Sequence, residues 1–344
     1  CIPFCLGTKP PEVTLNLLNY RYRHLDKAIE NAKKLGFKNG AALFPMVTMN
    51  GEECHNEWEI TFEEIHRNNA IAFAIFNYSR YTDDYQFLSG KGIEILVGIC
   101  RFWAQRVSYS YKKKKYVILG VTGPNEYENN VNNNWYTNYS TKWCFEFTID
   151  SINTIKKNHI KLFDKFSKKL NFKENEMDYW LEVSKNIYLH ENKEFKVFVQ
   201  QDGFFDKELN EVDKLDYSER PLNQNWSWDR ILRSPYIKQA DVLQGIYFFE
   251  DEFDIESIKS NYEFYQKFTV HESSLSPCIH SIIASKLGKT ESAYDLFKRA
   301  SRLDLDDYNY EVNEGLHITS MAGSWLSIVE GFAGMRVKKN SLHF

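Results

Sequence analysis

The sequence predicts an all-α protein in which inner and outer helices alternate to form a toroid. The first observation is the hydrophobic periodicity, which follows the helical repeat through almost the whole chain. The second is the spacing of the connections, because short turns alternate with long irregular loops. In a toroid these long loops gather at one end, where a scaffold usually displays its chemistry.

About ten helices are expected from this periodicity. The first begins at a proline pair, Pro10 and Pro11, and stops by Gly36, a residue suited to a helix C-terminus. The others are amphipathic or apolar segments bounded by turn-forming residues. The expected helices span residues 10–34, 65–81, 88–107, 136–160, 176–189, 238–250, 254–267, 276–287, 291–303 and 320–332.

Two stretches depart from the helical pattern. Residues 195–234 are irregular, aromatic and acidic. Residues 120–138 follow a short apolar β-type run at 116–119 and are rich in glycine, proline and asparagine, the residues of turns. This second stretch carries two carboxylates, Glu126 and Glu128, in a loop between regular elements. Such a loop is a candidate location for catalytic groups.

Composition limits the class of protein. With 344 residues, 43% hydrophobic and 26% charged, the chain is globular and forms one large domain or two ordinary ones. Aromatic residues reach 16%, which fits bulky helix packing or a sugar site where rings stack on pyranose faces. A net charge of −4 gives no reason to expect nucleic acid. No apolar run reaches the about 18 residues of a membrane span, so no membrane partner is expected.

The six cysteines are scattered, without the paired spacing of a metal site. Several lie in apolar helical context, which favours reduced, buried thiols over a disulfide framework. We therefore expect a reducing compartment, the cytoplasm, and no metal. The chain begins with Cys1 instead of Met, which indicates a fragment.

Four blocks of the sequence together resemble glycoside hydrolase family 65. They occur in the family's order and span nearly the whole chain, at residues 50–68, 120–138, 271–277 and 315–325. The resemblance implies that residues 1–336 form most of an (α/α)6 barrel and that residues 337–344 start a C-terminal segment. The family's N-terminal β-sandwich, first barrel helices and C-terminal sheet are missing, so a barrel open on its N-terminal side is expected.

The resemblance also implies phosphorolysis of α-linked glucose disaccharides, with Glu126 as the general acid. Breaking a glycosidic bond requires a proton on the leaving oxygen, which a carboxylic acid can deliver. An inverting hydrolase adds a second carboxylate to activate water, whereas phosphate is already an anionic nucleophile. The expected reaction converts maltose and phosphate to β-D-glucose 1-phosphate and D-glucose. Glu128, two residues away, is expected to support the loop.

A phosphate site is expected near the last helix. Gly323 and Ser324 are placed close to its start, where free N–H groups and the helix dipole favour anions. His317 can add a donor or a positive charge, although without the resemblance it reads as a packed histidine. Glu272 would repel phosphate there, or would serve as the base in a hydrolase.

Two further sets are expected to bind sugar. Lys238 and Gln239 open a predicted helix, and the family's Lys-Gln pair contacts bound sugar; otherwise they are a solvated helix start. The loop His55, Asn56 and Glu57 resembles the stretch that faces the leaving sugar in members that cleave maltose. Imidazole, amide and carboxylate suit sugar hydroxyls, although the same groups could simply order the loop.

The resemblance implies no cofactor, inorganic phosphate as co-substrate, and a homodimer. Three alternatives stay open: a sister phosphorylase acting on trehalose or kojibiose, a glycoside hydrolase of the family, and an inactive carbohydrate-binding remnant. The family's Trp-Asp pair for the non-reducing glucose lies upstream of Cys1. For this reason the chain alone is expected to be inactive.

Overall fold

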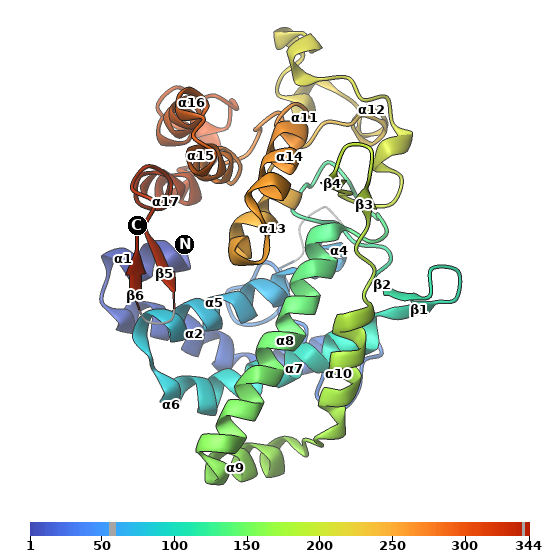
Figure 1. Ribbon diagram of the computed structural model, residues 1–344, viewed down its shortest axis with the longest axis vertical. Coiled ribbons are helices and arrows are strands. Elements are labelled where there is room, and N and C mark those ends of the chain that lie inside the picture. Colours follow the sequence, from blue (N-terminus) through green and yellow to red (C-terminus); the bar gives the residue numbers. More distant parts are fainter. Residues whose placement is uncertain (55–59, 339–340) are drawn as a thin grey trace.

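The computed structural model describes residues 1–54, 60–338 and 341–344, and this part is mostly helical. Six helices form an inner ring (Figure 1). In chain order they are α1 (Ile2–Thr8), α5 (Arg67–Thr82), α8 (Trp135–Asn158), α13 (Val242–Phe248), α15 (Pro277–Lys286) and α17 (Ile318–Leu326). Each packs against the next, and α17 packs against α1.

Outer helices cover the ring and alternate with it along the chain. They are α2 (Pro11–Arg23), α3 (Leu25–Lys34), α7 (Ile93–Arg106), α10 (Asn175–Asn186), α14 (Ile255–Tyr265) and α16 (Thr290–Ser301). For example, α7 packs on α5 and α8, and α16 packs on α15 and α17. This alternation agrees with the all-α toroid expected from the sequence and is consistent with an (α/α)6 barrel.

The remaining elements are short. Helical segments are α4 (Ile60–Glu63), α6 (Tyr85–Phe87), α9 (Ile160–Leu170), α11 (Leu222–Asn225) and α12 (Trp228–Arg233), with π-helical turns at Leu88–Gly92 and Ser327–Phe332. Antiparallel strand pairs join β1 (Ser108–Ser110) to β2 (Lys115–Val117), β3 (Glu191–Asn192) to β4 (Val197–Phe198), and β5 (Arg336–Lys338) to β6 (Ser341–His343). The strand β2 confirms the first two residues, Tyr116 and Val117, of the β-type run expected at 116–119.

Two expected helices differ from the structure, and one helix was not expected. The segment 10–34 divides at His24 into α2 and α3. The helix expected from Lys238 begins only at Val242, because a parallel bridge between Ile237 and Thr269 keeps the preceding residues extended. Helix α9 was not expected, although it buries Phe163 and Phe166.

The inner ring is closed where an opening was expected. Phe4 of α1 meets Trp325 of α17 edge to face, with ring centroids 5.7 Å apart. A Cβ at Gly7 would lie 2.3 Å from the Trp325 ring, so the helices approach closely because residue 7 has no side chain. The expectation of an open barrel is therefore wrong for the inner helices.

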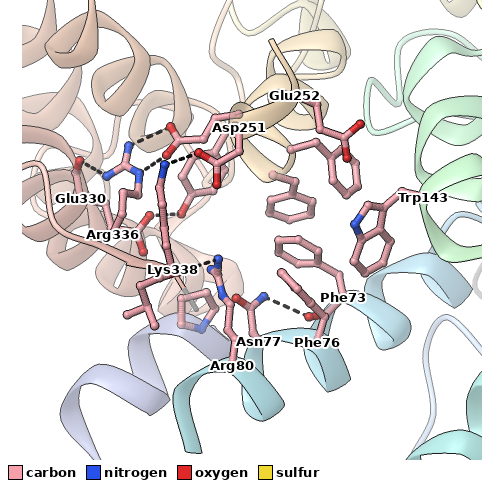
Figure 2. A pocket seen from close by; sticks show the side chains of 16 residues that line it. Phe73, Phe76, Asn77, Arg80, Trp143, Asp251, Glu252, Glu330, Arg336 and Lys338 are labelled. Carbon is pink, nitrogen blue, oxygen red and sulfur yellow. Dashed lines mark hydrogen bonds and ion pairs between the residues drawn. The ribbon is translucent and has the colours of Figure 1, made fainter. Parts of the chain in front are cut away.

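Polar loops and ion pairs occupy opposite ends of the ring. The long loops lead into the N-terminal ends of the inner helices, as expected. At the C-terminal ends, a cavity of about 120 Å³ is lined by aromatic rings including Phe73 and Trp143. Figure 2 shows Arg336 and Lys338, which belong to β5, at this cavity. Arg336 pairs with Glu250, and Lys338 pairs with Asp251. These charges neutralise one another in pairs.

The state of the cysteines and the character of the helices can be compared with the expectations from the sequence. All six cysteines are free thiols, and Cys100, Cys144 and Cys278 are buried. In the part of the chain that is described, no helix is both long and apolar enough to cross a bilayer.

Substituting Gly245 tests the packing of two inner helices. A Cβ on Gly245 in α13 would lie 2.7 Å from the Trp135 ring in α8. Gly245→Ala is expected to destabilise the protein by about 1–3 kcal/mol through overpacking, measured by chemical denaturation. Gly90→Ala is the control, because a Cβ there meets no atom within 4 Å. Equal stability of the two variants would contradict this packing.

Candidate active site

The loop at residues 120–134 is closed at its base by an antiparallel bridge between Val121 and Val131. Glu63 holds the same loop from outside. Its carboxylate accepts hydrogen bonds from the Thr122 hydroxyl at 2.7 Å and from the Asn130 N–H at 2.6 Å. These contacts hold the loop near both of its ends and leave its tip, which carries Glu126, between them.

Asp241 is buried and packs against this loop. Its carboxylate accepts hydrogen bonds from the Asn125 N–H at 3.1 Å and from the Asn134 amide at 3.0 Å. A Cβ at Gly123 would lie 2.4 Å from Asp241 Oδ2 and 2.3 Å from Asn134 Nδ2. Glycine is therefore required at position 123 for the loop to approach Asp241 this closely.

Glu126 and Lys238 form an ion pair at the tip of the loop. Their side chains are 23% and 19% exposed, so both groups remain accessible to a ligand. The Lys238 backbone N–H donates to Asn125 Oδ1 at 2.9 Å, which anchors the lysine beside the glutamate. The structure therefore brings together two site residues that the sequence predicted separately.

A second carboxyl group, Glu64, lies near Glu126. Burial, together with the negative charge of Glu126, raises the pKa of Glu64 to about 8. Glu64 therefore carries its proton at neutral pH. Glu64 lies inside the block at 50–68, and this position was the only sequence signal of a role at the site.

Glu128 and Glu272 are buried and paired. Glu128 forms an ion pair with Lys207, whose ammonium also donates to the Ser234 carbonyl at 2.9 Å. Such a pairing supports the loop, in agreement with the role expected for Glu128.

Glu272 accepts three hydrogen bonds, from Tyr127 Oη at 2.7 Å, the Leu222 N–H at 2.8 Å and Arg220 Nε at 3.1 Å. Its side chain is only 2% exposed. A carboxylate with its lone pairs occupied in this way does not activate water. It instead joins the loop that carries Glu126 to the segment around residues 220–222.

Gln239 is committed to the protein at both ends of its amide. Its nitrogen donates to the Pro124 carbonyl at 2.5 Å, and its oxygen accepts from the Ser273 hydroxyl. The side chain is buried. In this geometry Gln239 positions the loop, and sugar contact by its amide stays a prediction.

His317 lies immediately before α17, at the same end of the ring as Glu126. Asp304 Oδ1 is 2.6 Å from His317 Nδ1, and Glu311 Oε2 is 3.6 Å from His317 Nε2. Glu311 is within electrostatic range of both Lys238 and His317, and burial raises its pKa. Asp304 and Glu311 were missed by sequence reasoning, although both lie in the long loop before α17.

Gly323 and Ser324 do not lie at a helix start. Helix α17 begins at Ile318, so their N–H groups fall beyond the first four, which alone lack intrahelical partners. Gly323 packs against Cys278, where an added Cβ would lie 2.7 Å from Sγ, and the Ser324 hydroxyl donates to the Ser320 carbonyl at 2.8 Å. The physical basis for a phosphate site at these two residues is therefore wrong.

The predicted acceptor residues His55, Asn56 and Glu57 lie outside the described residues. Across the residues that are described, no group of three or more His, Cys, Asp or Glu side chains could hold a metal ion.

The protonation of Asp241 makes a testable contribution to stability. Burial raises its pKa from 3.8 to about 7, although the hydrogen bonds from Asn125 and Asn134 oppose this shift. The folded protein thus binds this proton more tightly than the unfolded chain, so stability is lost as pH rises from about 4 to 7. In melting curves at about pH 5 and 8, Asp241→Asn should lose less stability on alkalinisation than the wild type. Parallel curves for the two proteins would contradict the assignment.

Comparison with known proteins places this site in a family. Residues 1–326 match the profile described as "Glycosyl hydrolase family 65 central catalytic domain". The whole chain is 56% identical to maltose phosphorylase of Bacillus subtilis, covering 44% of that protein. It is also 41% identical to α,α-trehalose phosphorylase of Thermoanaerobacter brockii, again over the whole chain and 44% of the relative.

More distant relatives show the same pattern. The chain is 35% identical to kojibiose phosphorylase of Halothermothrix orenii, in an alignment that covers 99% of this chain and 45% of that protein. A solved structure assigned as a kojibiose phosphorylase from the human microbiome superposes with a TM-score of 0.91 at 38% identity, covering 99% of this chain and 50% of that one. The chain thus spans less than half the length of these curated relatives. It belongs to glycoside hydrolase family 65.

Proposed function

We propose that the complete protein carrying this chain is an inverting phosphorylase that converts maltose and inorganic phosphate to β-D-glucose 1-phosphate and D-glucose. The relative with 56% identity is a maltose phosphorylase. The observation that carries the mechanism is the difference between Glu126 and the carboxylates around it. Glu126 is accessible beside Lys238, whereas Glu128 and Glu272 are buried and paired.

This difference favours phosphorolysis over hydrolysis. An inverting hydrolase uses a second carboxylate as a base for water. Glu272, considered for that role from the sequence, has its oxygens occupied by Tyr127, Leu222 and Arg220. A single acid combined with an anionic nucleophile needs no such base.

In the proposed reaction Glu126 donates its proton to the oxygen that links the two glucose units. As the bond from C1 to that oxygen breaks, a phosphate oxygen bonds to C1 from the opposite face, which inverts the configuration from α to β. Lys238 donates hydrogen bonds to sugar hydroxyls. His317 contacts the phosphate, because its ring lies at the same end of the barrel and can donate a hydrogen bond.

His55, Asn56 and Glu57 are proposed to face the leaving glucose and to select maltose. The second candidate function is phosphorolysis of trehalose, which the relative with 41% identity favours. Both candidates use the same acid and the same nucleophile, so the choice of disaccharide distinguishes them. No cofactor or metal has a role in either reaction, and the phosphorylated product suits a cytoplasmic enzyme.

Phosphate dependence tests the reaction class. Incubating the complete protein with maltose should release glucose only when inorganic phosphate is present, with one sugar phosphate formed for each glucose. Parallel incubations with trehalose and kojibiose should give less product. Glucose release without phosphate would establish a hydrolase, and turnover of trehalose alone would establish the sister specificity.

Removing the acid tests the role of Glu126. Glu126→Gln should lower turnover of maltose by about 10²–10⁴-fold, because the leaving oxygen is no longer protonated. The same variant should retain activity on α-glucosyl fluoride, whose leaving group needs no proton. Glu146→Gln, which alters only an ion pair with Lys142 on α8, is the control. Unchanged maltose turnover by Glu126→Gln would disprove the mechanism.

A further inference from the structure

A single carboxylate holds both the ring and the backbone of His317. Asp304 Oδ1 lies 2.6 Å from His317 Nδ1, and Asp304 Oδ2 accepts the His317 backbone N–H at 2.9 Å. Asp304 follows α16 and His317 precedes α17, so the contact spans the connection between an outer and an inner helix. Rotation of the imidazole is thereby restricted on the side of Nδ1.

The same contact determines which ring nitrogen carries hydrogen. Burial alone would raise the pKa of Asp304, but the hydrogen bonds from the His317 ring and backbone hold it below its usual value. Asp304 is therefore ionised at neutral pH and acts only as an acceptor. The hydrogen between the two residues belongs to His317 Nδ1, which leaves Nε2 as the ring nitrogen available to a ligand.

His317 Nε2 faces a second carboxylate, Glu311, in the same loop before α17. Glu311 Oε2 lies 3.6 Å from it, too far for a hydrogen bond. Glu311 is in turn within electrostatic range of Lys238, which pairs with Glu126. The His317 side chain is 23% exposed, so a small anion can reach it.

We propose that Asp304 is a positioning residue for phosphate, which fixes the orientation and tautomer of His317 so that Nε2 meets the anion. The inference rests on the proposed function, because that function places phosphate at His317. When phosphate binds, His317 can take a proton at Nε2 and donate it in a charge-assisted hydrogen bond. The ionised Asp304 then stabilises the resulting imidazolium from the opposite side of the ring.

A purely structural role for Asp304 would predict a different set of effects. If Asp304 only stabilised the connection between α16 and α17, its replacement would lower stability and would change KM for phosphate and KM for maltose to a similar extent. As a positioning residue, it acts only through the His317 ring and only on phosphate. The two roles are therefore separated by comparing KM for phosphate with KM for maltose, and by testing whether the effect of Asp304 requires His317.

The experiment measures kcat, both KM values and the calorimetric Kd of inorganic phosphate for the complete protein. Asp304→Asn should raise KM and Kd for phosphate about tenfold, the loss typical of a hydrogen bond to a charged group. KM for maltose should change less than twofold. Asp304→Glu should recover part of the phosphate affinity, because it restores the charge. Asp306→Asn is the matched control, since Asp306 lies in the same loop and pairs with Arg302 at the surface.

A double-mutant comparison makes the result decisive. In a His317→Ala background, adding Asp304→Asn should change phosphate affinity less than twofold. An undiminished effect of Asp304→Asn in that background, equal increases in both KM values, or wild-type phosphate affinity in Asp304→Asn would each overturn the inference. If the wild type binds phosphate but does not cleave maltose, the proposed function fails while calorimetry still tests Asp304. Absence of phosphate binding by the wild type would overturn both.

Discussion

The common direction of the inner helices is the constraint on which the rest of the structure depends. Because these helices run alongside one another, the loops that enter them all arrive at one end of the barrel. The residues immediately before five of them are His66, Asn134, Asp241, Ser276 and His317. Segments far apart in the chain therefore meet there, as when Asn125 accepts the Lys238 N–H and Glu272 accepts the Tyr127 hydroxyl.

The same direction sets the electrostatic character of the site. Helix N-termini carry unpaired N–H groups and the positive end of the helix dipole, which favour carboxylates and anions. This environment accommodates several acidic side chains at one end of the barrel, among them Glu64, Glu126 and Glu272. Their different surroundings then give them different states: Glu64 is protonated, Glu272 accepts three hydrogen bonds, and Glu126 is left accessible beside Lys238.

Sequence periodicity predicted the fold class because the apolar face of each long helix is read directly from spacing. It predicted the location of the functional end for a related reason, since turn-forming residues mark the loops that enter the inner helices. Periodicity failed at Lys238, because the bridge from Ile237 to Thr269 is a tertiary contact that no local pattern records. It also placed Gly323 too close to a helix start, because the helix begins directly after His317.

Some residues of the candidate site were predicted from the sequence, and others are recognised only from their contacts in the structure. Glu126, Lys238 and His317 were predicted because the segments that contain them resemble a family. Asp304, Glu311 and Asp241 were not found, because their importance lies in what they contact and not in the residues beside them. Gln239 shows the converse, since a residue predicted from the same resemblance has its amide occupied by Pro124 and Ser273. Pairing among buried polar groups is a property of three-dimensional packing, which one sequence does not contain.

The contact between Phe4 and Trp325 has a consequence for how the chain folds. It joins the first inner helix to the last, so the ring closes only after nearly all intervening helices have formed. Contacts between such distant segments carry a large loop-closure entropy and slow folding. During synthesis on the ribosome, α1 emerges long before its partner and exposes its packing face until α17 follows. The chain is therefore expected to depend on chaperones during this interval, when its uncovered apolar surface is open to aggregation.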